Sequence, residues 1–116
     1  MLKQNYLTSK LEETSAIHDG LGKAMHATLM GKEDFQSAIS FLNYTILEPD
    51  ATIGLHKHGN DQEIYMFLEG NGVMTVNDEE FPVIPGDIVV NPPYGTHGVI
   101  NGSERKMAIL VWEVKK

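Results

Sequence analysis

The chain contains no cysteine. This absence excludes disulfide frameworks, thiolate nucleophiles and thiolate zinc sites, so histidine and carboxylate side chains must hold any bound metal. The absence of disulfides is compatible with a reducing compartment, and residues 1–8 lack the apolar core of a secretory signal. We therefore expect a cytoplasmic protein.

Positive charge and long apolar runs are also scarce. Nine Lys and Arg residues, scattered along the chain, face sixteen Asp and Glu residues, for a formal net charge of −7. Binding to nucleic acid needs a positive surface, so we expect no nucleic-acid partner. The longest apolar runs, such as 88–90 and 108–112, are far shorter than a membrane span, so we expect no membrane partner.

The 116 residues correspond to one domain. Eleven glycines and five prolines, mostly in the second half, separate short apolar segments about ten residues apart, which is typical of an all-β sandwich or barrel. We expect strands in residues 23–30, 37–47, 52–56, 63–68, 72–76, 81–84, 88–90, 97–100 and 106–114. Residues 1–36 then form an N-terminal arm and first strand, and residues 37–116 form the barrel.

Two features of this pattern leave alternatives open. Ser9 followed by Glu12 resembles a helix capping box, so a short helix ending before Gly20 is an alternative for the arm. The segment 63–68 is apolar on both faces, which indicates either a sandwiched sheet or an outer face covered by the arm or by a partner chain. We therefore expect a homodimer.

A compact group of polar residues carries the chemistry. His56 and His58 are one residue apart on an expected strand, so both imidazoles lie on one face, and Glu63 can approach them from the next strand. Imidazole nitrogen and carboxylate oxygen suit a borderline divalent cation. A His-x-His pair alone is weak evidence, but a second block beginning at Gly86 supplies His97 as a fourth ligand.

These two blocks resemble the paired motifs of the cupin family. The first motif is matched by His56, His58, Glu63 and Gly70, and the second by Gly86, Pro92, His97 and Asn101. Two positions depart from the motifs: Asp50 stands where the first opens with glycine, and Tyr94 replaces an inner glycine of the second. The resemblance spans residues 37–114. It implies a double-stranded β-helix, or jelly-roll barrel, with one divalent transition metal on His56, His58, Glu63 and His97, and leaves iron, manganese, nickel, zinc and copper open.

Other side chains near these ligands have more than one interpretation. Tyr65 and Phe67 share the inward face of Glu63, where Phe67 is expected to pack in the core. Tyr65 either packs there or donates to a metal-bound ligand, so Glu63 and Tyr65 are the candidate catalytic residues. His18 and His26 fit neither motif, and we expect surface or internally hydrogen-bonded histidines rather than ligands.

The resemblance implies a small oxygen-bearing ligand. We expect a metal-dependent enzyme of oxygenase, decarboxylase, lyase or isomerase type. The alternative is a non-catalytic module that uses the metal to bind or sense a sugar or carboxylate. A structural cupin of the seed-storage kind is disfavoured by the intact ligand set. The fold does not select among these reactions.

Overall fold

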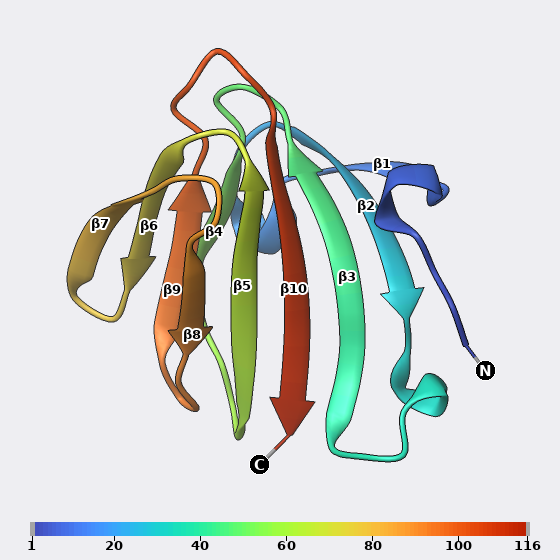
Figure 1. Ribbon diagram of the computed structural model, residues 1–116. Coiled ribbons are helices and arrows are strands. Elements are labelled where there is room, and N and C mark those ends of the chain that lie inside the picture. The colour runs from blue at the N-terminus through green and yellow to red at the C-terminus, as the bar shows by residue number, and fades with distance from the viewer. Residues whose placement is uncertain (1, 116) are drawn as a thin grey trace.

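The computed structural model describes residues 2–115, in which ten strands are accompanied by three short 3-10 helices (Figure 1). The helices are η1 (Tyr6–Thr8), η2 (Ile17–Asp19) and η3 (Lys32–Asp34). The strands are β1 (Glu12–Ser15), β2 (Lys23–Met30), β3 (Ile39–Leu47), β4 (Thr52–Lys57), β5 (Asp61–Glu69), β6 (Gly72–Val76), β7 (Glu79–Val83), β8 (Ile88–Asn91), β9 (Thr96–Ile100) and β10 (Met107–Lys115). No helix in residues 2–115 is long and apolar enough to cross a membrane.

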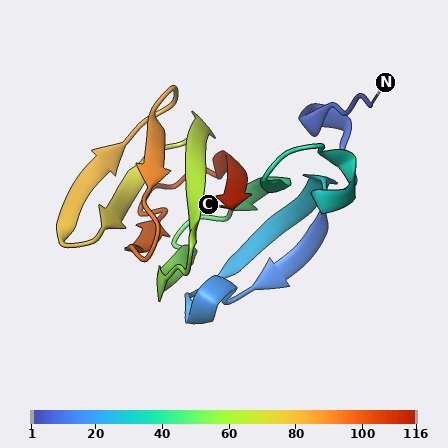
Figure 2. The same cartoon turned by 90° about the horizontal axis from the view of Figure 1, so that it is seen from below.

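The strands form two antiparallel sheets. The larger has the order β1-β2-β3-β10-β5-β8 and the smaller the order β4-β9-β6-β7. Figure 2 shows the structure curving from β7 (orange) to β1 and β2 (blue). Buried apolar side chains from both sheets, including Phe67, Met74, Val99 and Ile109, form one core. The predicted all-β barrel is confirmed.

The N-terminal residues do not form the short helix that was an alternative for the arm. The alternative of a short helix opened by Ser9 and Glu12 is wrong, because residues 12–15 form β1, which pairs antiparallel with β2. The Ser9 hydroxyl donates to the Tyr6 carbonyl at 2.8 Å, closing η1 instead of capping a longer helix. Pairing with β2 satisfies the backbone that a helix would have satisfied internally. The division into arm (1–36) and barrel (37–116) stays a prediction.

Alternation along β5 separates an inner from an outer face. Glu63, Tyr65 and Phe67 are buried, whereas Ile64 and Met66 are half-buried on the outer face. Part of the outer face of the larger sheet is covered by the N-terminal segment, since Tyr6 and Leu11 pack on a cluster formed by Ala27, Leu29, Tyr44 and Ala108. The arm therefore packs against its own sheet.

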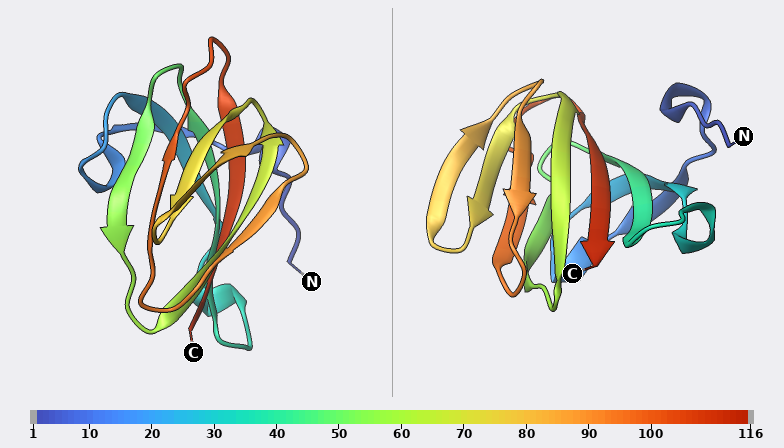
Figure 3. Two further views of the ribbon diagram at one scale, coloured as in Figure 1. Left: turned by 90° about the vertical axis from the view of Figure 1, so that its left-hand side faces the viewer. Right: turned by 60° about the horizontal axis from the view of Figure 1, so that its bottom comes forward.

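Residues 16–22, which we call the strap, connect β1 to β2 and pack on β4 (Figure 3, left). The backbone N–H of Thr52 donates to Leu21 O at 2.8 Å, and the N–H of Leu21 donates to Thr52 Oγ1 at 2.8 Å. Ala16, His18 and Asp19 have φ angles of 53°, 50° and 60°. Such left-handed residues persist only where the surroundings hold them, so the strap is fixed by its contacts with β4.

Candidate metal centre

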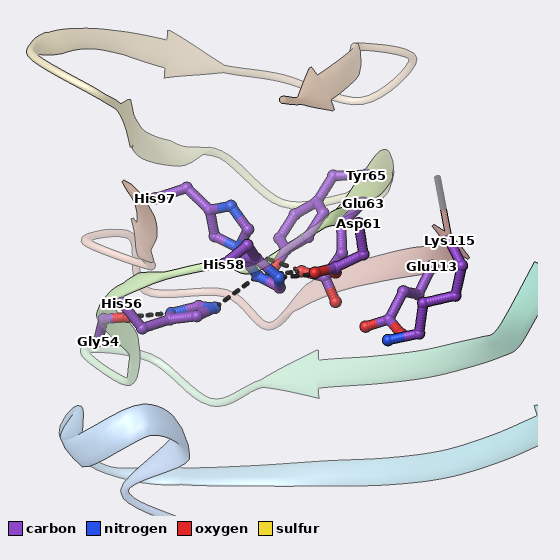
Figure 4. A network of polar contacts seen from close by, with 9 residues as sticks. All are labelled: Gly54, His56, His58, Asp61, Glu63, Tyr65, His97, Glu113 and Lys115. Atoms are coloured by element: carbon purple, nitrogen blue, oxygen red, sulfur yellow. Dashed lines mark hydrogen bonds and ion pairs between the residues drawn. The ribbon is translucent and has the colours of Figure 1, made fainter. Parts of the chain in front are cut away.

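Three strands bring the polar group together. His56 on β4 lies directly opposite His97 on β9 in the antiparallel ladder. His58 follows the end of β4, and its backbone N–H donates to Gly95 O at 2.9 Å, which holds the loop near β9. Glu63 projects inward from β5. Figure 4 shows the side chains of the four residues converging from these elements.

The potential ligand atoms are close to one another. His58 Nε2 lies 3.1 Å from His56 Nε2, 3.2 Å from His97 Nε2 and 3.0 Å from Glu63 Oε1. Glu63 Oε1 is also 3.1 Å from His97 Nε2. One atom from each of the four residues lies within 4.8 Å of all the others. The structure thus brings together His56, His58, Glu63 and His97.

The opposite ring nitrogens orient two of these imidazoles. His56 Nδ1 lies 2.7 Å from Gly54 O, to which only a protonated nitrogen can donate. His58 Nδ1 lies 2.9 Å from the buried Asp61 carboxylate. Burial lowers the pKa of His56 to about 4, so this ring is neutral at pH 7. Its Nε2 then carries a lone pair toward the centre, as in histidine ligands held by an outer carbonyl or carboxylate.

These contacts fit a divalent ion. Lone pairs on nitrogen and carboxylate oxygen repel one another at 3.0–3.2 Å unless a proton or a metal ion lies between them. Two atoms each about 2.1 Å from one ion are about 3.0 Å apart at a right angle and about 3.4 Å apart at a tetrahedral angle. The observed separations, 3.0–3.2 Å, lie between or at these values. The donor set and its spacing therefore suit a divalent ion.

The comparisons with known proteins agree with this geometry. The family model described as the cupin domain matches residues 43–113, more than half of the chain. The chain belongs to the cupin family. The oxalate-binding protein of Thermotoga maritima is 29% identical to this cupin over 99 residues, covering 85% of this chain and 82% of that protein.

Solved structures extend the likeness to the whole barrel. The crystal structure of a predicted oxalate decarboxylase from Thermotoga maritima matches this cupin with a TM-score of 0.94 and 25% identity, over 99% of this chain and 100% of that one. The cupin domain of Schizosaccharomyces pombe Cnp3 has a TM-score of 0.81 over 99% of this chain and 74% of that one, at 10% identity, and so supports the fold alone.

Tyr65 lies beside the four converging side chains of this cupin. Its Oη is 3.5 Å from His97 Nε2, and its ring centroid is 5.3 Å from that of His97. Burial and then the nearby Glu63 charge raise the pKa of Tyr65 well above 10. The hydroxyl therefore stays protonated at neutral pH and can donate a hydrogen bond. Phe67, two residues further along β5 on the same face, is buried in the core.

A cavity of about 130 Å³ adjoins the centre. Glu63 and Tyr65 line it from β5, whereas His18, His26 and Asn43 line it from η2, β2 and β3. A larger and more open hollow, about 620 Å³, is lined by Gly70 and Lys106 among others and includes none of the residues that converge here. Of the four converging side chains, Glu63 lines the smaller cavity.

His18 and His26 are absent from the group that could hold a metal within residues 2–115. His26 Nδ1 is hydrogen-bonded to Thr45 Oγ1 at 3.1 Å. The His18 ring stacks on the His56 ring, with centroids 3.6 Å apart and an angle of 10° between planes. Neither residue belongs to a motif, so nothing in the sequence indicates that either of them lines the cavity.

A second acidic group borders the centre. Asp61 and Glu113 lie near His58, close enough for the three side chains to share an ion. Asp61 already accepts from His58 Nδ1, and Lys115 Nζ lies 2.9 Å from Glu113 Oε1. These partners supply hydrogen bonding and positive charge, so Asp61 is better described as the group that orients His58. The spacing of Asp61, three residues after His58, is the signal that sequence reasoning missed.

Proposed function

We propose that this cupin holds one divalent transition metal ion on His56, His58, Glu63 and His97, and that the ion binds a small carboxylate. The convergence of three imidazole nitrogens and one carboxylate oxygen at 3.0–3.2 Å beside a cavity carries the proposal. When bound, such an ion polarises carboxylate or carbonyl oxygens as a Lewis acid. Iron, manganese, nickel, zinc and copper are all compatible with this ligand set.

Cavity size supports a small ligand. An engineered cavity of about 150 Å³ in another protein accommodates benzene, so about six non-hydrogen atoms fit in the 130 Å³ here. Oxalate is of this size, and the Thermotoga maritima relative is named for binding it. In our proposal the ligand occupies this cavity, and its carboxylate would bind the ion that His56, His58, Glu63 and His97 would hold.

Calorimetry with oxalate tests this proposal. The metal-loaded protein is expected to bind oxalate, and the same protein stripped by a chelator is expected to lose that binding. His97→Ala should behave like stripped protein. Lys57→Ala is the matched control, because Lys57 lies between the two histidines but is exposed and points away from them. Oxalate binding that is equal with and without metal would contradict the proposal.

Catalysis on the same ligand is the second candidate, and Tyr65 is the observation that favours it. Its protonated hydroxyl lies next to His97 Nε2, within reach of a ligand oxygen held at the centre. Glu63 is the other group there that can exchange a proton or shift its contacts. The enzyme would be of the lyase or decarboxylase type, with Tyr65 donating to the oxygen on which negative charge develops.

Measurements of turnover distinguish the two candidate functions, a binding module and an enzyme. If the protein is an enzyme, Tyr65→Phe should retain metal and ligand while turnover falls by about 10² to 10⁴. Glu63→Gln should depress turnover more than ligand capture, because only interactions that strengthen in the transition state raise the rate. The experiment uses a panel of small carboxylates, tested in air and without it. If they bind but none is transformed, the function is that of the binding module.

A further inference from the structure

The cavity has a second polar end, away from the centre. We call His26, Asn43 and Thr45 the distal wall; they lie on the inner face of β2 and β3, where His26 pairs in register with Thr45. Asn43 pairs with Val111 on β10, and Val111 pairs with Tyr65 on β5. Adjacent strands are about 4.8 Å apart, so the Cα atoms of Asn43 and Tyr65 are about 10 Å apart. The cavity thus extends across two strand spacings.

The distal wall offers hydrogen bonds without charge. His26 and Thr45 are hydrogen-bonded to each other. The pKa of His26 is lowered by burial, which favours the neutral ring. Within residues 2–115, Asn43 Oδ1 is buried and has no hydrogen-bond partner. No Lys or Arg among these residues lines the cavity.

This composition discriminates between ligand groups. An ionised carboxylate at the distal wall would lose its hydration without gaining a positive partner, which is costly. A hydroxyl has no such cost, and it both donates and accepts hydrogen bonds. It can therefore satisfy Asn43 whichever way the side-chain amide is turned. A methyl group would leave the amide without a partner.

We propose that the distal wall selects small hydroxy acids, in which one carboxylate binds at the metal centre and a hydroxyl two carbons away binds Asn43 and Thr45. The inference rests on the proposed function, since it requires the carboxylate to be held by the metal. With room for about six non-hydrogen atoms, a hydroxy acid of three carbons, which has six, fits the cavity.

The test compares two acids of equal size on the metal-loaded protein. β-Hydroxypropionate and butyrate differ only in a terminal hydroxyl against a methyl group. We expect wild type to bind the hydroxy acid about 2- to 10-fold more tightly, the range for one net hydrogen bond. Asn43→Leu should remove this preference with metal content unchanged, and Thr45→Val, a smaller change, should reduce it. Gln62→Leu, at an exposed position on β5, should keep it.

The test distinguishes a failure of the distal-wall inference from a failure of the proposed function. A wild-type protein that binds both acids equally, or a preference that persists in both distal-wall variants, would overturn the inference. If oxalate still binds in a metal-dependent way on those samples, the proposed function stands and the distal wall alone is misassigned. If no carboxylate binds the metal-loaded protein, the proposed function and this inference both fall.

Discussion

Asn101 is a single side chain that fixes the loops behind the site. It is fully buried, and its Nδ2 donates to the carbonyl oxygens of Leu47, Glu48 and Arg105 at 2.8–3.2 Å. Its Oδ1 accepts from the N–H and hydroxyl of Ser103. The motif asparagine therefore joins the end of β3 to the loop before β10, and its role is structural.

Removing that side chain should cost stability without changing the four residues that are the proposed metal ligands. Asn101→Ala leaves buried carbonyls without their donor, at about 1–3 kcal/mol for each group that stays unsatisfied, so we expect a loss of about 3 kcal/mol in the free energy of unfolding. Denaturant titration measures it. Asn71→Ala, at an exposed position, is the control. Equal unfolding midpoints for both variants would contradict this role.

The stability of the metal-free protein depends on pH through His56. Its pKa is lowered to about 4 in the folded state by burial, from 6.5. Between these values the unfolded chain binds a proton that the folded chain does not, so stability is fully present above pH 6.5 and is lost as the pH falls toward 4. We expect the unfolding midpoint of chelator-treated protein to fall over this window, and to fall less in His56→Gln. An equal slope in both proteins would exclude His56 as the cause.

At the scale of elements, the strap is positioned by a glycine. A Cβ on Gly54 would overlap the carbonyl oxygen of His18, so β4 accepts the strap only because position 54 has no side chain. The close approach places the His18 ring on His56. The strap thus forms part of the wall around the centre, although it precedes the motifs in sequence.

Gly54→Ala should displace the strap. Overpacking of this kind costs about 1–3 kcal/mol, and we expect a lower melting temperature and weaker metal binding, because His18 no longer packs on His56. Gly102→Ala is the matched control, since a Cβ there meets nothing within 4 Å. Gly54→Ala with the stability and metal affinity of Gly102→Ala would show that the strap contact is unimportant.

The elements also show what sequence could and could not predict. Strands and the positions of His56, His58 and Glu63 follow from local periodicity, because alternation fixes which face a side chain occupies. The capping pattern of Ser9 and Glu12 indicated a short helix that does not form, because β1 pairs with β2 instead. The strap could not be predicted, because its left-handed residues Ala16, His18 and Asp19 are not glycines and its docking depends on the distant Gly54.

At the scale of the whole molecule, β8 leaves an apolar edge. It is the last strand of the larger sheet, where Ile88 and Val90 are 59% and 53% exposed. In register they face Met66 and Ile64 on β5, whose outer sides are half-buried. Edge strands with exposed apolar side chains tend to pair with another chain. The predicted homodimer stays a prediction, and this edge is the surface on which we expect it to form.

Light scattering or sedimentation measures the dimer directly. Wild type is expected at twice 12.9 kDa, and Ile88→Lys/Val90→Lys is expected at the monomer mass, because charge on the edge opposes pairing. Ile84→Lys changes an exposed apolar residue outside β8 and should leave the dimer intact. A strictly monomeric wild type at high concentration would contradict the prediction.

Elemental analysis of purified protein measures whether the four converging side chains bind a metal. We expect close to one divalent transition metal ion per chain in wild type and in Lys57→Ala. In the folded His56→Ala/His58→Ala variant we expect metal to be nearly absent, since only Glu63 and His97 of the four ligands remain. Equal metal in wild type and in the double variant would show that His56 and His58 do not hold the ion.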